Sequence, residues 1–531
     1  MHLCPIPGVS GSPTAFIPPA RRSTRLFSPG VPSGAARTCA AEWATRLHVG
    51  TFTPGGTFDS AIERLDHLAS LGIDYVEVMP VATFPGDRGW GYDGVGLYAV
   101  HSAYGGPEAF VRFIDAAHAR GLGVVLDVVH NHLGPEGNYL SQFGPYFTGR
   151  HHTPWGEAVN LDDEGSQHVR AFLLGAVQQW LVDFRLDGLR LDAVHALADD
   201  SPRHFLAELS DFVADLERST GRPLLLVAES DLNQPAMVSP TGSVPGARGM
   251  EAQWADDVHH ALHSFLTSET QGYYVDFGSI QVLEKALTRV FVHDGTHSTF
   301  RERDWGAPVD PASPLYDGHS FVTFLQNHDQ VGNRATGDRI SRSIEPGQQA
   351  AGAALYLLSA FAPMLFMGEE WAASTPFPYF CDLGPELGPL VTEGRAREFA
   401  AMGWDEPTPD PQAESTFRSA VLCWEENADG AHARMLAWYR RLIEIRHTHP
   451  GASDPRLDST QIEIIDDDTL IMRRGRLAVA ATRATDRVVP IHIGADAEVL
   501  ASWDEPRHTD PGTFDLRGPG VLIVDTTPKS S

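Results

Sequence analysis

Apolar segments rich in β-forming residues recur along most of this chain, and amphipathic segments separate them. Eight such runs are present, at 47–52, 75–80, 124–129, 189–194, 224–229, 252–258, 321–326 and 364–368. They are apolar on both faces, as the strands of a buried parallel sheet are. A strand followed by a helix, repeated eight times, predicts the α/β class and a (β/α)8 TIM barrel with loop insertions.

The segments between these runs have the spacing of amphipathic helices. Segment 59–71 places its apolar residues on one side. Segment 107–120 opens with a proline and ends before Gly121, and these residues are favoured at the first helical position and just after the last. Ser166 is predicted to cap a third helix.

The chain is longer than a barrel alone requires. Its 531 residues predict a large catalytic domain with smaller satellites. We expect the barrel at 46–452, with an inserted loop subdomain at about 134–163, where glycine, proline, tyrosine and tryptophan interrupt the rhythm. Turns and short β-like runs after the barrel predict a small C-terminal β-sandwich at 453–531.

Residues 1–45 are predicted to be irregular. They contain seven prolines and four arginines but one acidic residue, Glu42, and such a composition buries too little apolar surface to order itself. The pair Arg21-Arg22 lacks the apolar region that an export signal requires. A transit peptide, a disordered tail and a misread start remain open.

The composition is strongly acidic. The chain has 40 lysines and arginines against 69 aspartates and glutamates, which gives a net charge of −29. Such a surface repels nucleic acids and anionic membranes, so we expect neither as a partner. The sequence has no run of about 18 apolar residues that would predict a membrane span, and its four cysteines form no disulfide framework. We therefore predict a cytoplasmic protein and leave its oligomeric state open.

Four acidic residues stand at the ends of predicted strands. Asp127 lies near the end of the third strand, Asp192 of the fourth and Glu229 of the fifth, and Asp329 follows the seventh. Functional residues of a barrel gather at the carboxyl ends of its strands. A buried carboxylate is also costly unless it is paired. The sequence therefore predicts that these acids meet at the mouth of the barrel.

Basic and polar residues accompany these acids. Arg190 stands two residues before Asp192, so both side chains point to one face of the strand, and the guanidinium is expected to keep that carboxylate ionised. His132 follows Asp127 in the same motif, and His328 precedes the fourth acid. These histidines could instead bind a metal, but no spacing typical of a zinc site is present, so we predict no catalytic metal.

Paired carboxylates facing a neutral substrate indicate glycoside hydrolysis. In that reaction one carboxylate attacks the anomeric carbon and one acid protonates the leaving oxygen. Aromatic residues in predicted loops or at strand ends fit this chemistry, because sugar rings stack on flat apolar faces: Trp90, Tyr92, Tyr146, Phe147, Trp155 and Trp371.

Four motifs resemble the signature regions of the α-amylase family, glycoside hydrolase family 13. They are DVVHNH (127–132), DGLRLDAVH (187–195), VAESD (227–231) and FLQNHDQ (324–330), and both their order and their spacing match. The resemblance implies a retaining mechanism. It also implies Asp192 as nucleophile, Glu229 as general acid/base and Asp329 as the carboxylate that binds and distorts the sugar at the cleaved ring.

Within that family the chain is similar to the maltooligosyltrehalose trehalohydrolases. The similarity covers roughly residues 46–450 and includes LHVGTFTPGGTF (47–58), QWADDVHHALH (253–263) and MLFMGEEWAASTPF (364–377). It implies hydrolysis of the α-1,4 bond next to the α,α-trehalose end of maltooligosyltrehalose or a related α-glucan, with no cofactor. The predicted substrate-binding residues are Tyr92, Asp93, Asp127, His132, Arg190, His195, His328, Trp155 and Trp371.

Two alternatives remain at this stage. Another α-amylase-family activity, such as glucan branching, debranching or ordinary amylase activity, fits the motifs GEEWAAS and WGYDG. A non-catalytic glucan-binding protein would typically lack one of the carboxylates. The chain departs from its subfamily before the barrel, where the subfamily normally carries a β-sandwich of about 90 residues. If that domain is missing, the barrel face that docks it is expected to be exposed.

Overall fold

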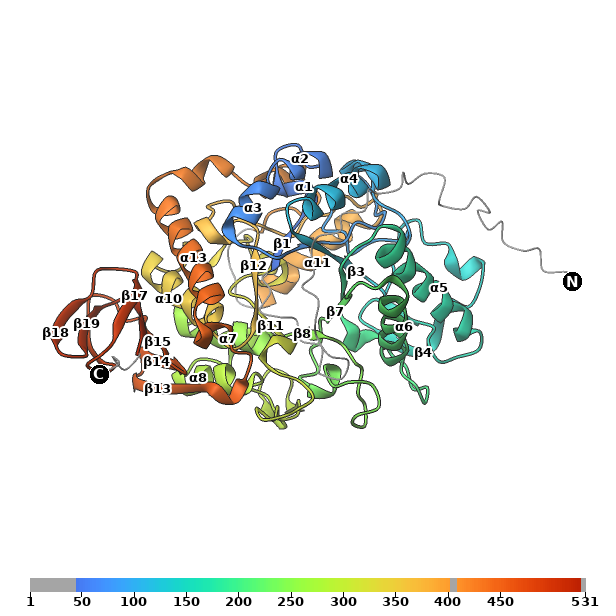
Figure 1. The fold of residues 1–531 in the computed structure, drawn as a ribbon. Helices are drawn as coiled ribbons and strands as arrows, with labels where there is room; N and C mark the ends of the chain where they lie inside the picture. The colour runs from blue at the N-terminus through green and yellow to red at the C-terminus, as the bar shows by residue number, and fades with distance from the viewer. Residues whose placement is uncertain (1–43, 402–407, 527–531) are drawn as a thin grey trace, which may run out of the picture.

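Eight parallel strands close into a barrel in the computed structural model, which describes residues 44–401 and 408–526. In sheet order they are β1 (Ala44–Leu47), β12 (Ala362–Phe366), β11 (Phe321–Thr323), β8 (Ala252–Trp254), β7 (Leu225–Ala228), β6 (Gly188–Leu191), β3 (Gly123–Val128) and β2 (Tyr75–Val78). The predicted (β/α)8 barrel is confirmed (Figure 1). The prediction for residues 1–45 falls almost wholly outside the described residues.

Two predicted strands have different bounds in the structure. The first strand ends at Leu47, and the run that follows it forms the short helix α1 (Val49–Phe52), so the predicted strand 47–52 was wrong. The run 252–258 joins the end of β8 to the start of helix α7 (Asp256–Thr267). Both errors have one cause: the end of a buried strand and the start of the next helix are equally apolar, so hydropathy does not separate them.

Helices surround the barrel. The predicted helix 59–71 is broken at Arg64 into α2 (Phe58–Ile62) and α3 (Leu65–Leu71). Segment 107–120 forms α4 (Gly106–His118), with its proline in the first turn as expected. Ser166 is the first residue of α5 (Ser166–Gln178) rather than its cap, because Gly165 takes that place in the left-handed conformation. The other longer helices are α6 (Phe205–Thr220), α7, α8 (Ile280–Arg289), α10 (Pro346–Leu357), α11 (Gly388–Ala401) and α13 (Gly430–Thr448), and the shorter ones are α9 (His328–Gly332), α12 (Glu414–Ser419) and α14 (Pro450–Ser453).

Two small antiparallel hairpins lie outside the barrel sheet. Strands β4 (Phe147–Thr153) and β5 (Gly156–Val159) form the first, within the segment predicted as an inserted subdomain. Strands β9 (Thr296–Ser298) and β10 (Arg303–Trp305) form the second, in the long connection between β8 and β11.

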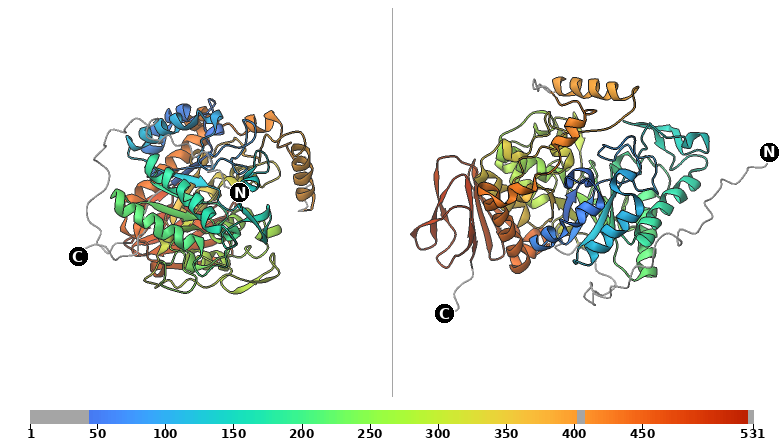
Figure 2. Two further views of the ribbon diagram at one scale, coloured as in Figure 1. Left: turned by 90° about the vertical axis from the view of Figure 1, so that its right-hand side faces the viewer. Right: turned by 90° about the horizontal axis from the view of Figure 1, so that it is seen from above.

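The C-terminal part of the chain is antiparallel. One sheet has the order β13 (Thr460–Asp466), β14 (Thr469–Arg474), β15 (Leu477–Thr482), β20 (Gly520–Asp525) and β17 (Glu498–Ser502), and the other β16 (Val488–His492), β19 (Thr513–Arg517) and β18 (Arg507–Asp510). Apolar side chains from both sheets share one small core, which is the arrangement of a β-sandwich. Figure 2 shows these strands at one end of the molecule.

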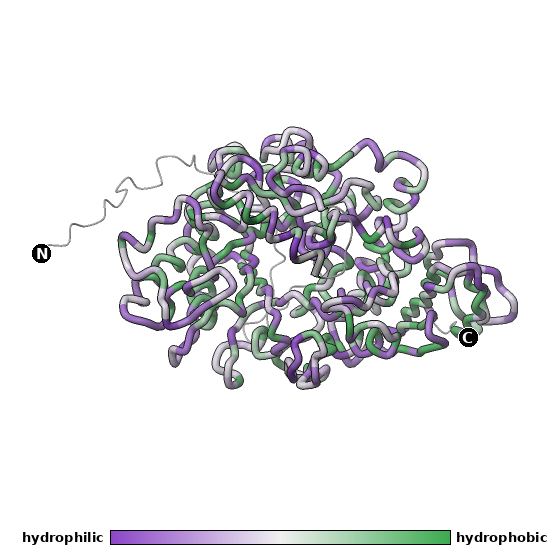
Figure 3. The backbone as a smooth tube through the Cα atoms, turned by 180° about the vertical axis from the view of Figure 1, so that it is seen from behind, coloured by the Kyte–Doolittle hydropathy of each residue, from purple (hydrophilic) through white to green (hydrophobic). Residues whose placement is uncertain are grey.

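The hydropathy of the chain follows this architecture. Barrel strands and the inner faces of the helices carry the apolar residues, while the outer loops are mostly hydrophilic (Figure 3). Within the described residues, no helix has the length and apolar character needed to cross a membrane.

Candidate active site

The four predicted acids come together at one end of the barrel. Asp127 and Arg190 are opposite each other in the register of β3 and β6. Asp192 and Glu229 directly follow β6 and β7, and Asp329 is the second residue of α9, shortly after β11. The carboxyl ends of neighbouring parallel strands meet at the same edge, so residues far apart in sequence form one cluster.

Arg190 connects three of these acids. It is fully buried, and its Nη1 donates to Asp127 at 2.9 Å and to Oδ1 of Asp192 at 2.8 Å. Its Nη2 lies 3.0 Å from Oε2 of Glu229. The guanidinium also stacks over Trp254 of β8, 4.3 Å from the ring centroid. A rigid planar cation of this kind fixes the relative positions of the nucleophile and the acid.

The nucleophile is held on both sides of its carboxyl group. Oδ1 of Asp192 accepts from Arg190, and Oδ2 accepts from Nδ2 of Asn131 at 2.9 Å. The amide of Asn131 also donates to the backbone carbonyl of Asp192 at 2.6 Å. Ala193 then adopts the left-handed conformation, with φ 37°, and turns the chain away from the mouth. Such backbone strain in a residue other than glycine is typical of functional sites.

Asp192 and Asp329 both bind protons more tightly than an ordinary aspartate. Burial and the charge of Glu229 raise the pKa of Asp192 to about 8, although Arg190 opposes the shift. Burial and the charge of Glu229 likewise raise the pKa of Asp329 to about 7. Arg190 does favour the ionised form of Asp192, as expected, but its guanidinium is shared among three carboxylates and does not outweigh burial and the charge of Glu229. The charge of Glu229 is the largest repulsion that opposes ionisation of Asp192, so the two acids titrate as a coupled pair.

The acid/base residue is positioned by one of its oxygens. Oε2 of Glu229 accepts from the backbone amide of Ala193 at 2.7 Å and lies beside Arg190. The backbone of Glu229 is fixed as well, since its amide donates to Leu191 and its carbonyl accepts from Val194. Because both contacts fall on Oε2, we assign the transferable proton to Oε1.

Asp127 anchors a second buried arginine that sequence reasoning missed. Arg46 of β1 donates from Nη2 to Asp127 at 2.6 Å and from Nε to Nδ1 of His328 at 3.2 Å. It also bonds Glu77 of β2, which is opposite it in the strand register, and the hydroxyl of Tyr92. Burial alone would raise the pKa of Asp127, but the two arginines hold it below its usual value. The sequence contained one indication of the pair between Arg46 and Glu77: Glu77 is an acidic residue inside the apolar run 75–80.

His328 and Tyr92 form one wall of the site. Their rings stack with centroids 5.2 Å apart, and the hydroxyl of Tyr92 donates to Asp127 at 2.7 Å. Burial and the neighbouring Arg46 hold the pKa of His328 well below its usual range, so its ring is neutral. Nδ1 accepts from Arg46, which leaves the proton on Nε2, 3.5 Å from Asp329. The two side chains therefore lie beside Asp127 and Asp329, and their contact with substrate stays a prediction.

His132 contacts protein atoms rather than an open space. Its Nδ1 bonds Oδ1 of Asn131, and its Nε2 lies 3.0 Å from the carbonyl oxygen of Tyr92. Its ring is stacked parallel to Trp155 with centroids 4.3 Å apart. Trp155 is half-exposed at the turn between β4 and β5. We infer that Trp155 offers a flat face to a sugar and that His132 supports it.

Asp93 and His195 are two further predicted substrate-binding residues. Asp93 is half-buried, and burial together with Glu136 raises its pKa. Its backbone packs so closely against Gly134 that a Cβ there would lie 2.0 Å from the carbonyl oxygen of Asp93, so glycine is required. His195 is exposed, and its Nδ1 accepts from the backbone amide of Asp231 at 3.3 Å.

Trp371 does not belong to the site, which corrects the prediction. The side chain is fully buried, and its ring packs 4.9 Å from Trp424 and 5.7 Å from His67. β12 ends at Phe366, and the chain turns at Gly368 with φ 82° into a short 3-10 helix that points the indole into the core. A ring without exposed surface cannot stack on a sugar.

The other predicted aromatic residues have mixed positions. Trp90 is buried against Phe377 and lies 5.3 Å from His328, so it supports the wall of the site. Tyr146 and Phe147 are half-buried at the inserted hairpin, and Tyr146 packs against Phe172. These three are packing residues.

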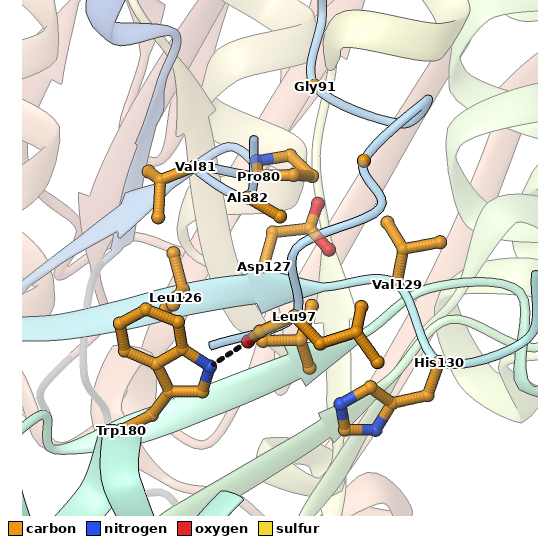
Figure 4. A pocket seen from close by; sticks show the side chains of 12 residues that line it. Pro80, Val81, Ala82, Gly91, Leu97, Leu126, Asp127, Val129, His130 and Trp180 are labelled. Atoms are coloured by element: carbon orange, nitrogen blue, oxygen red, sulfur yellow. Dashed lines mark hydrogen bonds between the residues drawn. The ribbon is translucent and has the colours of Figure 1, made fainter. Parts of the chain in front are cut away.

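A small cavity of about 20 Å³ lies behind Asp127. Pro80, His130 and Trp180 are among its lining residues, and the Trp180 indole donates to the carbonyl of Leu97 (Figure 4). This volume accommodates about one water molecule. A sugar ring is far larger, so this cavity is not a sugar-binding site.

A further carboxylate near the mouth was also missed. Asp256 is the first residue of α7, two positions after β8, which lies between β7 and β11. Burial and the charges of Glu229 and Asp329 raise the pKa of Asp256 well above its usual value. The residue was hidden inside the predicted run 252–258, which was interpreted wholly as strand.

One group of side chains outside the acidic cluster has the geometry of a cation site. Within the described residues, His151, Asp162 and Asp200 place ligand atoms within 4.8 Å of one another. Arg150 already lies 3.7 Å from Asp162 and 3.4 Å from Asp200, so both carboxylates have a positively charged partner without a metal ion. The absence of a catalytic metal stays a prediction.

Comparison with known proteins places this chain in a family. The family model described as alpha amylase, catalytic domain, matches residues 25–147. A malto-oligosyltrehalose trehalohydrolase from Arthrobacter ramosus is 50% identical over 90% of this chain and 81% of its own length. Its counterpart in Mycobacterium tuberculosis is 45% identical over 93% of this chain and 85% of its own length. The chain belongs to the malto-oligosyltrehalose trehalohydrolase family.

Solved structures agree with this family membership. A Salmonella typhimurium protein assigned as an alpha amylase has a TM-score of 0.81 and 38% identity, and the match covers 92% of this chain and 82% of that one. An Anoxybacillus alpha-amylase has a TM-score of 0.63 and 18% identity, covering 93% of this chain and all of its own. At that identity the second likeness concerns the fold alone. The predicted fold, the family and its glycoside hydrolase class are therefore confirmed.

Proposed function

We propose that this protein hydrolyses the α-1,4-glucosidic bond next to the α,α-trehalose end of maltooligosyltrehalose and releases trehalose. The chemistry is supported by one observation: a single guanidinium, Arg190, contacts both Asp192 and Glu229 at the barrel mouth. The substrate is supported by the family, whose Arthrobacter ramosus member is a trehalohydrolase 50% identical to this chain.

The geometry supports a retaining mechanism. Two carboxyl groups held by one guanidinium fit the separation of about 5–5.5 Å that retention needs better than the 6.5–9.5 Å of inversion. Asp192 attacks the anomeric carbon while Glu229 protonates the leaving oxygen from Oε1, so the glycosidic bond breaks and trehalose leaves. Water then attacks the glycosyl ester, and Glu229 takes its proton, which restores both residues.

Each remaining site residue has a task in this proposal. Asp329 and the Nε2–H of His328 bind hydroxyl groups of the ring that is cleaved, with Asp93 beside them. Asp127 and Tyr92 hold the two arginines and the histidine in position, and Trp155 stacks on a sugar. His195 serves the leaving side, because it is bonded to the loop that follows Glu229. No metal or cofactor is needed for any step.

Domain division and location complete the proposal. A catalytic barrel at 46–452 and a C-terminal β-sandwich at 453–531 are supported by the interval between α14, which ends at Ser453, and β13, which begins at Thr460. A cytoplasmic location is supported by the two described cysteines, Cys381 and Cys423, which are both free thiols.

The product assay tests the proposal directly. The purified protein is incubated with maltooligosyltrehalose, and in parallel with an unmodified maltooligosaccharide of equal length, and the products are separated by chromatography. We expect free trehalose and a shorter maltooligosaccharide from the first substrate, and none with Asp192→Asn. Transfer of chain segments into branches, or cleavage of internal bonds without trehalose, would instead establish another α-amylase-family activity.

A further inference from the structure

The side of the mouth nearest Glu229 carries an aromatic rim that the mechanism does not use. The hairpin β9–β10 lies there, and we name residues 296–305 the rim hairpin. Phe300 stands at its tip with 53% of its surface exposed, although a phenylalanine gains by burial. Its ring meets Tyr273 edge-on, with centroids 6.2 Å apart. An exposed, backed aromatic ring beside a sugar site offers a flat stacking surface.

The rim hairpin is fastened to the loop that follows the acid/base residue. Arg301 forms an ion pair with Asp231, two residues after Glu229, and the indole of Trp305 donates to the carbonyl of Asp231 at 2.6 Å. The side chain of Asp231 keeps 45% of its surface exposed. The exposed side chain of His195 contacts the same loop, because its Nδ1 accepts from the backbone amide of Asp231. The polar side chains of Asp231 and His195 therefore lie on the loop contact to which the hairpin of Phe300 is fastened.

The opposite end of the rim reaches the third carboxylate. The hydroxyl of Tyr273 lies 3.5 Å from Oε1 of Gln330, the residue after Asp329. Helices α7 and α8 pack against each other (Figure 1), Tyr273 lies in the loop between them, and the rim hairpin follows α8. An arc thus runs from Asp329 through Tyr273 and Phe300 to Asp231, and it borders the side on which Glu229 stands.

The rim hairpin is rigid. Arg301 and Arg303 both place their guanidinium groups over the ring of Trp305, at 5.1 and 4.4 Å from its centroid. Gly306, just after β10, packs so closely that a Cβ there would lie 2.0 Å from the carbonyl of His293. A platform that is fixed before binding loses little entropy when a ligand arrives, which favours selectivity.

We propose that Phe300 is the platform for the second glucose ring of the leaving disaccharide, and that the rim hairpin selects a trehalose end over a maltose end. The leaving oxygen must lie within reach of Glu229, so the leaving sugars extend over the residues attached to its loop. A 1,1-linked disaccharide joins two anomeric carbons and directs its second ring differently from a 1,4-linked one. Asp231 and His195 bind hydroxyl groups of the first ring. This inference rests on the proposed function.

Paired substrates test this inference. For wild type and Phe300→Ala, kcat/KM is measured on maltooligosyltrehalose and on an unmodified maltooligosaccharide with the same number of glucose units. We expect Phe300→Ala to reduce the preference for the trehalose end about tenfold, which corresponds to about 1.4 kcal/mol. Phe300→Trp should restore most of it, because the flat face returns. Calorimetry should show the same loss of affinity for free trehalose, with little change for maltose.

The control is Phe143→Ala, which removes another exposed aromatic ring, 71% exposed and located on the inserted segment. It should change both substrates equally and leave the preference unaltered. An unchanged preference in Phe300→Ala, in an enzyme that still releases trehalose, would overturn the inference and leave the proposed function intact. An equal loss on both substrates would also overturn it, since Phe300 would then act only by supporting the loop of Glu229. Failure of the wild type to release trehalose would refute the proposed function itself.

Discussion

The nucleophile should weaken the fold at neutral pH, and Asp192→Asn measures by how much. The pKa of Asp192 rises from its ordinary 3.8 to about 8 in the folded protein, because its carboxyl group is buried beside Glu229. A shift of about four pKa units corresponds to about 6 kcal/mol, since each unit is worth about 1.4 kcal/mol. This is an upper bound, because the two acids share their protons and titrate as a pair.

The sign of the effect follows from linkage. Below about pH 4 the carboxyl group is protonated in both the folded and the unfolded chain, so it costs nothing. As the pH rises from 4 toward 8, the unfolded chain releases the proton and the folded chain must keep it or carry a buried charge, so wild-type stability falls. Asparagine stays neutral throughout. The stability of Asp192→Asn relative to wild type should therefore increase between pH 4 and 8 and level off above.

The assay is the midpoint of urea or thermal unfolding at a series of pH values, at one scan rate and one salt concentration. The variant also loses a hydrogen bond from Asn131. That loss is worth about 1 kcal/mol and is present at every pH of the series, so the slope and not the offset is the test. Asp329→Asn should behave alike, with its window ending near pH 7. Asp59→Asn, at an exposed ion pair with Arg112, should show no such rise.

A flat difference between Asp192→Asn and wild type across pH 4–8 would contradict this reasoning. It would mean that Arg190 neutralises Asp192 in full, despite being shared with Asp127 and Glu229. A difference that falls with pH would show that the folded protein stabilises the charged form.

Three further predictions concern catalysis. Glu229→Gln should lose about 10²–10⁴-fold in rate on the natural substrate. On a glycosyl fluoride, whose leaving group needs no proton, Glu229→Gln should recover part of the first step, seen as a burst of fluoride release, whereas Asp192→Asn should gain nothing. A burst in Asp192→Asn and none in Glu229→Gln would exchange the two roles. Trp371→Ala should destabilise the fold by about 3–5 kcal/mol in urea unfolding and leave KM unchanged. Trp155→Ala should raise KM and leave stability unchanged. A raised KM in Trp371→Ala would place the Trp371 ring in the substrate site. Chelator should leave activity intact, and a loss that calcium restores would contradict the prediction that no metal is needed.

The catalytic acids could be predicted from sequence because the barrel itself brings them together. Asp192, Glu229 and Asp329 each follow a buried strand, and parallel strands present their carboxyl ends at one edge whatever the loops do. An error of two residues in a strand boundary does not change that conclusion. The fold class was predictable for the same reason, since eight strand-then-helix repeats fit few other architectures.

The residues that were missed depend on details that hydropathy does not contain. Arg46 was placed before the first strand, because the run that was recognised begins at Leu47, whereas the strand ends there. Asp256 was absorbed into a run that joined strand to helix. Trp371 was assigned to a loop, but a turn at Gly368 buries its ring. To predict each of these residues correctly, one must know where its side chain points. That direction depends on the residue at which a strand ends or the chain turns.

The number of charges at the mouth explains why the site can hold a catalytic proton. Six carboxylates converge among the described residues, namely Glu77, Asp127, Asp192, Glu229, Asp256 and Asp329, and two buried arginines, Arg46 and Arg190, face them. With every group ionised the cluster would carry 2 − 6 = −4 charges in a region largely shielded from water. Such a cluster must retain protons at neutral pH. The arginines fix which acids can ionise: Asp127, in contact with both, keeps its charge, and the remaining acids compete for protons. The protons are therefore shared within the cluster, and burial of the nucleophile among these charges lowers the stability of the fold by an amount that the pH series on Asp192→Asn would measure.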